Sequence, residues 1–234
     1  MPAHIASTRS ARRLRWDSSV NVVWDGNSLV YGVGSTGGQT LPTQVAALAP
    51  MAGSGAAVTN CGISGQRWSA MTSGATDVDG AWQTGKTNVL ICWETTNSAC
   101  NTPGLSAAQI ISDITAYIAA RRAAHPWVIV GLTTIPRETS GLMTSQSERE
   151  RLNGVMTTVD AAMRAGELDF DAIVDVRQPG SAFALAGYTT ADFDGSGWIW
   201  AELSPNRVHL LNAGYAIVAG YVAEALKRLP RTAR

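Results

Sequence analysis

The sequence lacks the features that mark several large classes of protein. Its 18 lysines and arginines balance its 18 aspartates and glutamates, so the net charge does not favour nucleic acid or an anionic membrane as a partner. It contains no apolar run of roughly 18 residues, which a membrane-spanning helix needs. Three cysteines are too few for a disulfide framework, and with three scattered histidines they form no zinc motif. We therefore expect neither a metal nor an organic cofactor.

The first 17 residues are basic and contain no apolar stretch after their arginines. A secretory signal needs such a stretch, so no signal peptide is visible and we expect a soluble protein. We expect residues 1–17 to form a mobile tail. The compartment and the oligomeric state are left open by the sequence.

The rest of the chain is apolar enough to build one domain, because 45% of the 234 residues are hydrophobic. From residue 18 to residue 230, short apolar segments alternate with longer segments of helical pattern. The expected strands cover residues 20–24, 57–60, 87–93, 127–132 and 172–176, and the expected helices cover residues 40–49, 106–124, 147–165 and 212–229. This order predicts an α/β protein, a three-layer α/β/α sandwich around a parallel sheet of about five strands. Functional residues are expected at the carboxyl ends of such strands.

A glycine-rich segment that carries a serine follows the first expected strand, WDGNSLVYGVGS at residues 24–35. Alone, it is typical of either a serine nucleophile or a phosphate-binding loop. No Gly-Lys-Ser/Thr follows and no compact G-x-G-x-x-G opens a helix, which disfavours the phosphate loop. Three more polar segments lie after later strands or before the last helix, namely NCGISGQRW, CWETTNSAC and SPNRVHLLNAGY.

Taken in order, the four segments resemble the blocks of the SGNH hydrolases, or GDSL-type esterases and lipases, especially the forms found in bacteriophages and their bacterial hosts. The resemblance covers about residues 18–230 and implies the flavodoxin-like fold of that family. It implies a nucleophile at Ser28, within Gly-Asn-Ser-Leu, and a base at His209. It also implies an oxyanion hole formed by Ser28, Gly65 and Asn97.

These residue types suit acyl transfer independently of the resemblance. A serine needs a base to take its proton, and the developing oxyanion needs hydrogen-bond donors. His209 is placed between the last strand and the last helix, whereas His4 lies in the tail and the position of His125 at a helix end is explained by the helix dipole. We therefore expect Ser28 to attack an ester carbonyl and water to release the acyl group.

The main departure from the family pattern is Asn206, which stands where the family has the aspartate that orients the histidine. Asparagine carries no charge and stabilises a histidine cation less well. Another acid could serve, or a backbone carbonyl could hold the ring and leave a Ser–His dyad, or the activity is reduced or abolished, whether naturally or by an engineered substitution. Ser98 likewise replaces the acid that follows the family's asparagine. The candidate substitute acids before the histidine are Asp192, Asp194 and Glu202.

Five of the eight tryptophans fall near the expected site, Trp24 among them, and the other four are candidate substrate contacts: Trp68, Trp93, Trp198 and Trp200. Aromatic faces suit sugar rings, but they equally suit the wall of an acyl pocket or packing under long loops. Residues 178–202 form a candidate lid. The expected substrate is a small acyl ester or an acetylated glycan, and deacetylation of a polysaccharide is the sharper hypothesis. The alternative function is a glycan-binding module that kept the scaffold and lost the activity.

Overall fold

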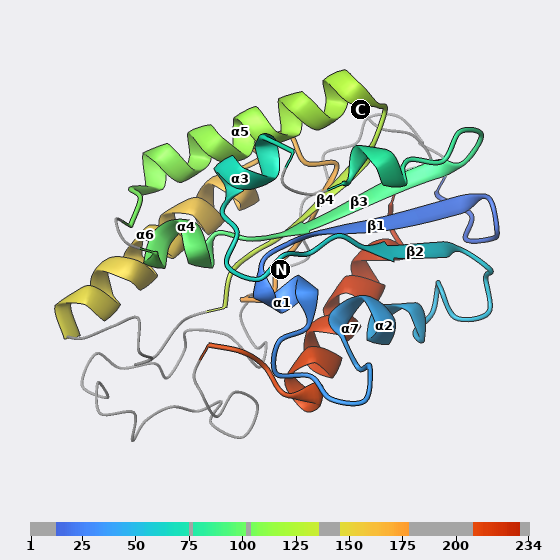
Figure 1. Cartoon of the computed structure of the whole chain (residues 1–234), viewed down its shortest axis with the longest axis horizontal. Helices are drawn as coiled ribbons and strands as arrows, with labels where there is room; N and C mark the ends of the chain where they lie inside the picture. The colour runs from blue at the N-terminus through green and yellow to red at the C-terminus, as the bar shows by residue number, and fades with distance from the viewer. Residues whose placement is uncertain (1–12, 75–76, 102–103, 136–145, 178–207, 230–234) are drawn as a thin grey trace.

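A computed structural model of the chain describes residues 13–74, 77–101, 104–135, 146–177 and 208–229, in which strands and helices alternate (Figure 1). The strands are β1 (Val20–Gly26), β2 (Ala57–Asn60), β3 (Thr87–Trp93), β4 (Val128–Leu132) and β5 (Ala172–Val174). The helices are α1 (Ser28–Tyr31), α2 (Leu41–Ala46), α3 (Trp68–Thr72), α4 (Thr96–Cys100), α5 (Ala107–Ala124), α6 (Gln146–Ala165) and α7 (Asn212–Leu226), with a short 3-10 helix η1 (Asp79–Ala81).

The five strands form one parallel sheet in the order β2-β1-β3-β4-β5. Because β1 pairs with β2 on one side and β3 on the other, its carboxyl end lies between theirs, with Trp24 opposite both Asn60 and Ile91. The residues that follow these three strands therefore meet at one edge of the sheet. The parallel sheet and the α/β class are confirmed.

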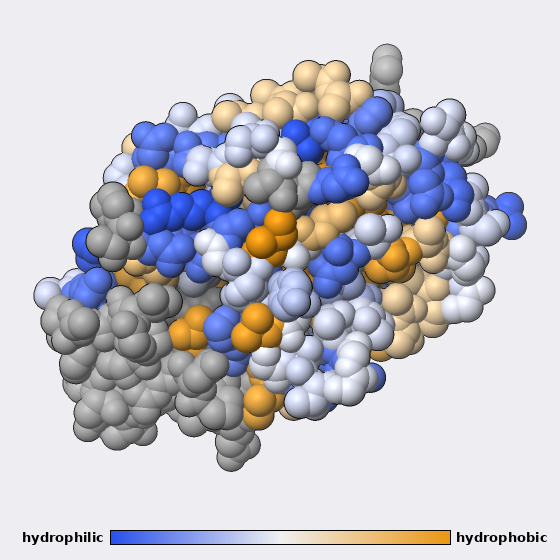
Figure 2. Space-filling model, in the orientation of Figure 1, coloured by the Kyte–Doolittle hydropathy of each residue, from blue (hydrophilic) through white to orange (hydrophobic). Residues whose placement is uncertain are grey.

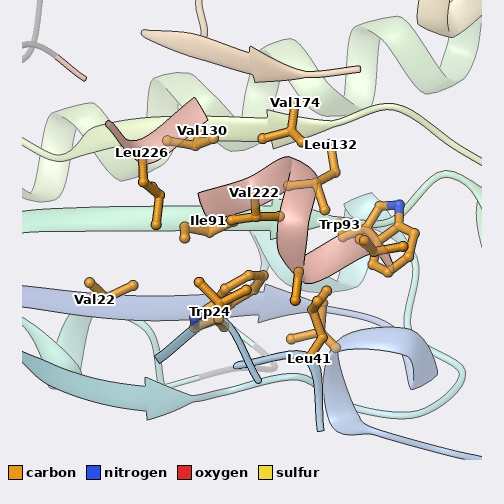
Figure 3. Close-up of a cluster of buried hydrophobic side chains, with 14 of the residues drawn as sticks. Val22, Trp24, Leu41, Ile91, Trp93, Val130, Leu132, Val174, Val222 and Leu226 are labelled. Atoms are coloured by element: carbon orange, nitrogen blue, oxygen red, sulfur yellow. The ribbon is translucent and has the colours of Figure 1, made fainter. Parts of the chain in front are cut away.

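Alternate side chains along each strand point to opposite faces, which produces two cores. Trp24 and Ile91 lie in the core that α2 and α7 cover (Figure 3). Val23 and Leu90 belong to the core that α3, α5 and α6 cover. Helices thus cover both faces of the sheet, as the three-layer prediction requires (Figure 1).

The long elements lie within a few residues of the expected bounds, and Ser106 caps the start of α5. The Ser106 hydroxyl accepts the Gln109 N–H at 3.2 Å, as a cap of α5 should. The Gln109 side chain donates instead to the Asp113 carboxylate, one turn further along α5, at 2.9 Å. The short helices α1, α3 and α4 were not predicted.

The last part of the segment expected to form a mobile tail, residues 1–17, packs against the end of the chain. Residues 1–12 lie outside the described residues, but the next ones pack on the end of α7. The Leu14 N–H donates to the Leu229 carbonyl at 2.9 Å, and Trp16 Nε1 donates to the Leu226 carbonyl at 3.3 Å. Leu14 is also buried, so apolar contact overrides the basic character of this segment.

On the face shown in Figure 2, hydrophilic residues are interspersed with residues of intermediate hydropathy, and the most hydrophobic residues lie in small separate groups. No helix among the described residues is long and apolar enough to cross a membrane. All three cysteines are free thiols. The large apolar side chains that are exposed in the described part of the chain are Tyr31, Leu48, Val58, Ile63 and Leu211.

Candidate active site

Ser28 is the first residue of α1, directly after the carboxyl end of β1. Asn27 caps this short helix, because its side-chain oxygen accepts the Leu29 N–H at 2.9 Å. The Ser28 carbonyl accepts the N–H groups of Gly32 and Val33 at 3.0 and 2.9 Å. These hydrogen bonds fix the backbone of Ser28 at the edge of the sheet.

His209 comes from the opposite end of the chain, just before α7, and reaches Ser28 directly. Its Nε2 lies 2.9 Å from the Ser28 Oγ, across 181 positions of sequence. That distance is within hydrogen-bond range and is the one that proton transfer from a serine to a base requires. The structure therefore brings together the two residues that the sequence singled out.

His209 is held near Ser28 by contacts between the loop after α1 and the start of α7, which we call the clasp (residues 33–36 with residues 209–215). The Tyr215 hydroxyl donates to the Val33 carbonyl at 2.7 Å. The side chain of Asn212 accepts the Thr36 N–H at 2.9 Å and donates to the Thr36 hydroxyl at 3.1 Å. These bonds tie the segment that carries the imidazole to the segment that carries the hydroxyl.

The clasp is also close-packed at Gly34. This residue has φ +89°, and a Cβ there would lie 2.4 Å from the Leu210 carbonyl oxygen and 3.2 Å from the His209 Cβ. Only glycine satisfies both the backbone conformation and the close approach. The register of the two segments therefore depends on the absence of a side chain at this position.

Gly65 lies in the loop between β2 and α3 with φ +86°, and a Cβ there would meet no atom within 4 Å. The conformation favours glycine, and its backbone is open on the side where a side chain would stand. The N–H groups of Gly65 and Ser28 donate to no acceptor among the described residues. Both groups are therefore available to a ligand.

Asn97, in the short helix α4 after β3, lies against the Gly65 loop. Its Nδ2 donates to the Gln66 carbonyl at 3.0 Å. Because an amide NH₂ group has two hydrogens, this bond leaves one hydrogen for a further acceptor. Asn101 Nδ2 adds a second link between the loops, to the Gly65 carbonyl at 3.3 Å.

Glu94 is a buried residue of this site that the sequence reasoning missed. Its Oε1 accepts the N–H groups of Asn97 and Ser98 at 2.7 and 3.2 Å, and its Oε2 accepts the Ser98 hydroxyl at 2.7 Å. Burial raises the pKa of this carboxyl, and the bonds from the Ser98 hydroxyl and the backbone oppose the rise. The carboxylate that Ser98 does not supply is thus present beside Asn97 from another position. The signal was a charged residue that directly follows an apolar strand.

Thr95, two residues before Asn97, adopts φ +127°, which is unusual for a residue other than glycine. A β-branched residue in that region is strained, by an amount on the order of 1–3 kcal/mol. Its hydroxyl accepts the indole N–H of Trp68 at 3.1 Å, which helps to hold the conformation. The backbone bend that precedes Asn97 is therefore kept by packing and hydrogen bonding, although a glycine would adopt it with less strain.

The proposed sugar-binding role of Trp68 and Trp93 needs correction. Each is only 1% exposed, so its ring lies in the core and presents no free face. Trp68 packs edge-on against Tyr117, with ring centroids 5.3 Å apart, and Trp93 Nε1 donates to the Thr133 carbonyl at 3.0 Å. The packing interpretation of the tryptophans holds for these two.

Asn206 and the other two tryptophans, Trp198 and Trp200, lie outside the described residues. So do the lid candidate and the substitute acids Asp192, Asp194 and Glu202. Within the described ranges, no group of three or more His, Cys, Asp or Glu side chains is placed to hold a metal ion.

Comparison of the chain with known proteins gives a family match and a set of similar folds. The sequence profile of the GDSL-like Lipase/Acylhydrolase family matches residues 26–217, a span that includes Ser28, Gly65, Asn97 and His209. No protein of curated function matches the chain in sequence.

Three solved structures illustrate the similarity in fold. A member of the lipolytic protein G-D-S-L family from Veillonella parvula DSM 2008 is 17% identical with a TM-score of 0.62, over 90% of this chain and 100% of that one. The acetyl xylan esterase AlAXEase is 16% identical with a TM-score of 0.62, over 88% and 98%. A carbohydrate esterase family 3 protein from Talaromyces cellulolyticus is 18% identical with a TM-score of 0.58, over 88% and 96%. At these identities the likeness concerns the fold.

Proposed function

Because this chain belongs to the GDSL-like lipase/acylhydrolase family, we propose that it is a serine ester hydrolase that works through an acyl-enzyme. The observation that carries the proposal is the 2.9 Å contact between the Ser28 Oγ and the His209 Nε2. A hydroxyl hydrogen-bonded to an imidazole is the arrangement that activates serine for attack.

In the proposed reaction, the Ser28 Oγ attacks the ester carbonyl carbon while His209 Nε2 takes the hydroxyl proton. The carbonyl oxygen becomes an oxyanion, which accepts hydrogen bonds from the Ser28 and Gly65 N–H groups and from the free hydrogen of the Asn97 amide. The C–O bond to the alcohol then breaks, and His209 returns the proton to the departing alkoxide. Water attacks the acyl-enzyme in the same way, with His209 again as base, and releases the carboxylic acid.

The support for His209 as a base does not depend on an acid at position 206. The clasp already fixes the segment that carries the ring through the side chains of Asn212 and Tyr215. A Ser–His dyad, or a triad completed by another acid, is therefore the version that we propose. An uncharged partner leaves the imidazolium less stabilised, so the rate is expected to be below that of a triad with a carboxylate.

For the substrate, we propose a carboxylic ester with a small acyl group, and an O-acetylated carbohydrate as the first to test. Two of the similar folds carry the names of an acetyl xylan esterase and a carbohydrate esterase. Tyr31 is the exposed aromatic residue nearest in sequence to Ser28, three positions along the same helix, and is 59% exposed. Residues three apart on a helix are neighbours on its surface. A several-fold rise in KM with kcat retained in Tyr31→Ala would identify this ring as a substrate contact.

The test is labelling with a fluorophosphonate probe, which reacts with an activated serine. We expect labelling of the native chain and none of Ser28→Ala, and faster labelling of Asn206→Asp if the missing carboxylate limits the rate. Release of acetate from acetylated xylan is then compared with hydrolysis of a simple aryl acetate and of long-chain esters. Hydrolysis of long-chain esters alone would refute the proposal that the substrate carries an acetyl group.

The alternative, a glycan-binding module without turnover, rests on the uncharged residue at position 206. Binding of a glycan by a chain that neither labels nor hydrolyses any ester would favour it over the hydrolase.

A further inference from the structure

A carboxylate is buried beneath the candidate nucleophile. Asp25, the penultimate residue of β1, is 0% exposed. Its Oδ2 accepts the Tyr117 hydroxyl of α5 at 2.7 Å, and its Oδ1 accepts the side-chain amide of Gln66 at 3.1 Å. Burial raises the pKa of Tyr117 well above its ordinary value, so the hydroxyl stays protonated as a donor. A buried carboxyl group is tolerated only when donors satisfy it, and here one of the donors leads to the site.

Gln66 is fixed by two acceptors at once. Its Nε2 donates to the Gly26 carbonyl at 2.6 Å as well as to Asp25. Both acceptors belong to the end of β1, two and three residues before Ser28. The side chain of Gln66 therefore ties the loop that contains Gly65 to the strand that carries the nucleophile. The Ile63 N–H adds a further bond to the same Gly26 carbonyl, at 2.9 Å.

The backbone of Gln66 in turn fixes the amide of Asn97. Its carbonyl accepts Asn97 Nδ2 at 3.0 Å. A carbonyl oxygen can only accept, so this contact determines which side of the Asn97 amide carries the NH₂ group. With one hydrogen used here, the direction of the other hydrogen is set by the position of the Gln66 carbonyl.

We infer that Gln66, anchored by Asp25, is a positioning residue that aims the Asn97 amide at the oxyanion. The inference rests on the proposed function, because the oxyanion exists only if Ser28 attacks a carbonyl. Gln66 acts through Asn97 and does not itself touch the reacting atoms. Its side chain sets the position of its own carbonyl, and the carbonyl sets the orientation of the donor.

The test uses Gln66→Met, which keeps a chain of similar length and loses both side-chain donors while the backbone carbonyl remains. We expect kcat for an aryl acetate to fall by about 10- to 100-fold with KM nearly unchanged, because a misaimed donor loses part of the 10²- to 10³-fold that one oxyanion-hole donor contributes. The decisive readout is the same substitution in an Asn97→Ala background, where we expect a further loss of less than about threefold.

A matched control is Asn21→Leu, at the start of the same strand. Asn21 Nδ2 also donates to one backbone carbonyl and one side-chain oxygen, those of Ala81 and Asn88, at 2.9 and 2.8 Å. We expect it to lower the midpoint of thermal unfolding as much as Gln66→Met does and to leave kcat unchanged. Asp25→Asn keeps an oxygen for Gln66, since the Tyr117 hydroxyl can turn to accept, and is expected to retain activity.

Each outcome decides the inference. If Gln66→Met lowers kcat by the same factor in the Asn97→Ala background as in the native chain, or if Asn21→Leu lowers kcat equally, the role of Gln66 is a general structural one. Either result would overturn the inference. Unchanged turnover in Gln66→Met, with activity that still disappears in Ser28→Ala, would overturn this inference alone. Absence of any Ser28-dependent turnover in the native chain would overturn the proposed function and this inference together. If Gln66→Met is unfolded, an inactive but folded Asp25→Asn would count against the inference.

Discussion

The two halves of the candidate site are built in different ways. The oxyanion half consists of Ser28 with the loops after β2 and β3. Buried side chains join it to the sheet, since Gln66 donates to the Gly26 carbonyl and Glu94 accepts the Asn97 N–H. The base half consists of His209 and the start of α7, which the clasp holds against the loop after α1. The first half is an extension of the core, whereas the second is a docked segment.

This difference separates two kinds of effect. Changes in the oxyanion half should alter stabilisation of the transition state while the proton relay is intact. Changes in the clasp that holds the base half should alter the distance between imidazole and hydroxyl, and also the stability of α7 on the sheet. Substitutions at His209, Asn97 and Gly34 test this distinction, and one at Asp160, apart from both halves, serves as a reference.

The largest effect is expected from His209→Ala. Loss of the base should lower kcat by about 10³- to 10⁶-fold while the midpoint of thermal unfolding changes little, because the half-buried ring belongs to neither core. The control is His125→Ala, which removes the ring stacked 4.7 Å from Trp82 and should lower stability but not activity. Equal turnover in the two variants would exclude His209 as the base.

In the oxyanion half, Asn97→Ala should lower kcat by about 10²- to 10³-fold with little change in KM. Asn97→Asp has the same size, but a carboxylate cannot donate and repels the oxyanion, so it should fall at least as far. Steady-state kinetics on an aryl acetate would show both. Retained kcat in the aspartate variant would exclude a donor role for this side chain.

Within the clasp, Gly34→Ala should lower kcat by about 10-fold or more, because its Cβ would stand 2.4 Å from the Leu210 carbonyl and displace His209. Gly85→Ala is the matched control, since Gly85 has φ +81° and no atom within 4 Å of a Cβ. Both variants carry the same backbone strain and should lose a similar part of their stability from it, but only the first should lose activity. Identical kinetics for the two would mean that the clasp does not position the base.

The smallest effect on turnover is expected from Asp160→Asn, which lies apart from both halves. The Asp160 carboxylate on α6 accepts from Thr134, after β4, at 2.7 Å and from Arg177, after β5, at 2.9 Å. Burial raises its pKa from 3.8 to about 6, although Arg177 and Thr134 oppose the rise. The proton is therefore bound more tightly in the folded state, so this group's stabilisation is complete below about pH 4 and is lost as the pH rises through about 6.

Urea unfolding of the native chain and of Asp160→Asn between pH 4 and pH 7 measures this pH dependence of stability. The stability of Asp160→Asn relative to the native chain should rise by about 3 kcal/mol at most over that range, with kcat unchanged. A constant difference in stability would show that the carboxyl titrates normally.

Much of the fold was accessible from the sequence, because its long elements carry strong patterns. The apolar run at residues 89–93 indicated a buried strand and lies in β3, and the spacing of isoleucines such as Ile110 and Ile114 indicated the buried face of α5. The helices of four or five residues at the ends of strands were missed, since so few residues show no period. The packing of Leu14 and Trp16 on α7 was missed because it depends on contacts about 210 positions apart.

The site was predictable where motif order carries information and unpredictable where burial decides. The order of the four segments indicated that Ser28 and His209 would meet. It gave no sign that Trp68 and Trp93 would turn into the core, because a count of aromatic residues does not reveal which face of a strand or helix they occupy. Glu94 was overlooked for a related reason, since a charged residue after a strand is usually read as the start of an exposed loop.

The clasp also bears on when the protein becomes competent during its synthesis. The hydroxyl leaves the ribosome first, and the imidazole follows 181 residues later, a delay of roughly 10 to 40 seconds at typical rates of translation. Until α7 emerges and packs against the loop after α1, the nascent chain has Ser28 but lacks the imidazole that we propose as its proton acceptor. Under the mechanism proposed above, hydrolysis therefore cannot begin on the growing polypeptide and starts only after α7 has docked.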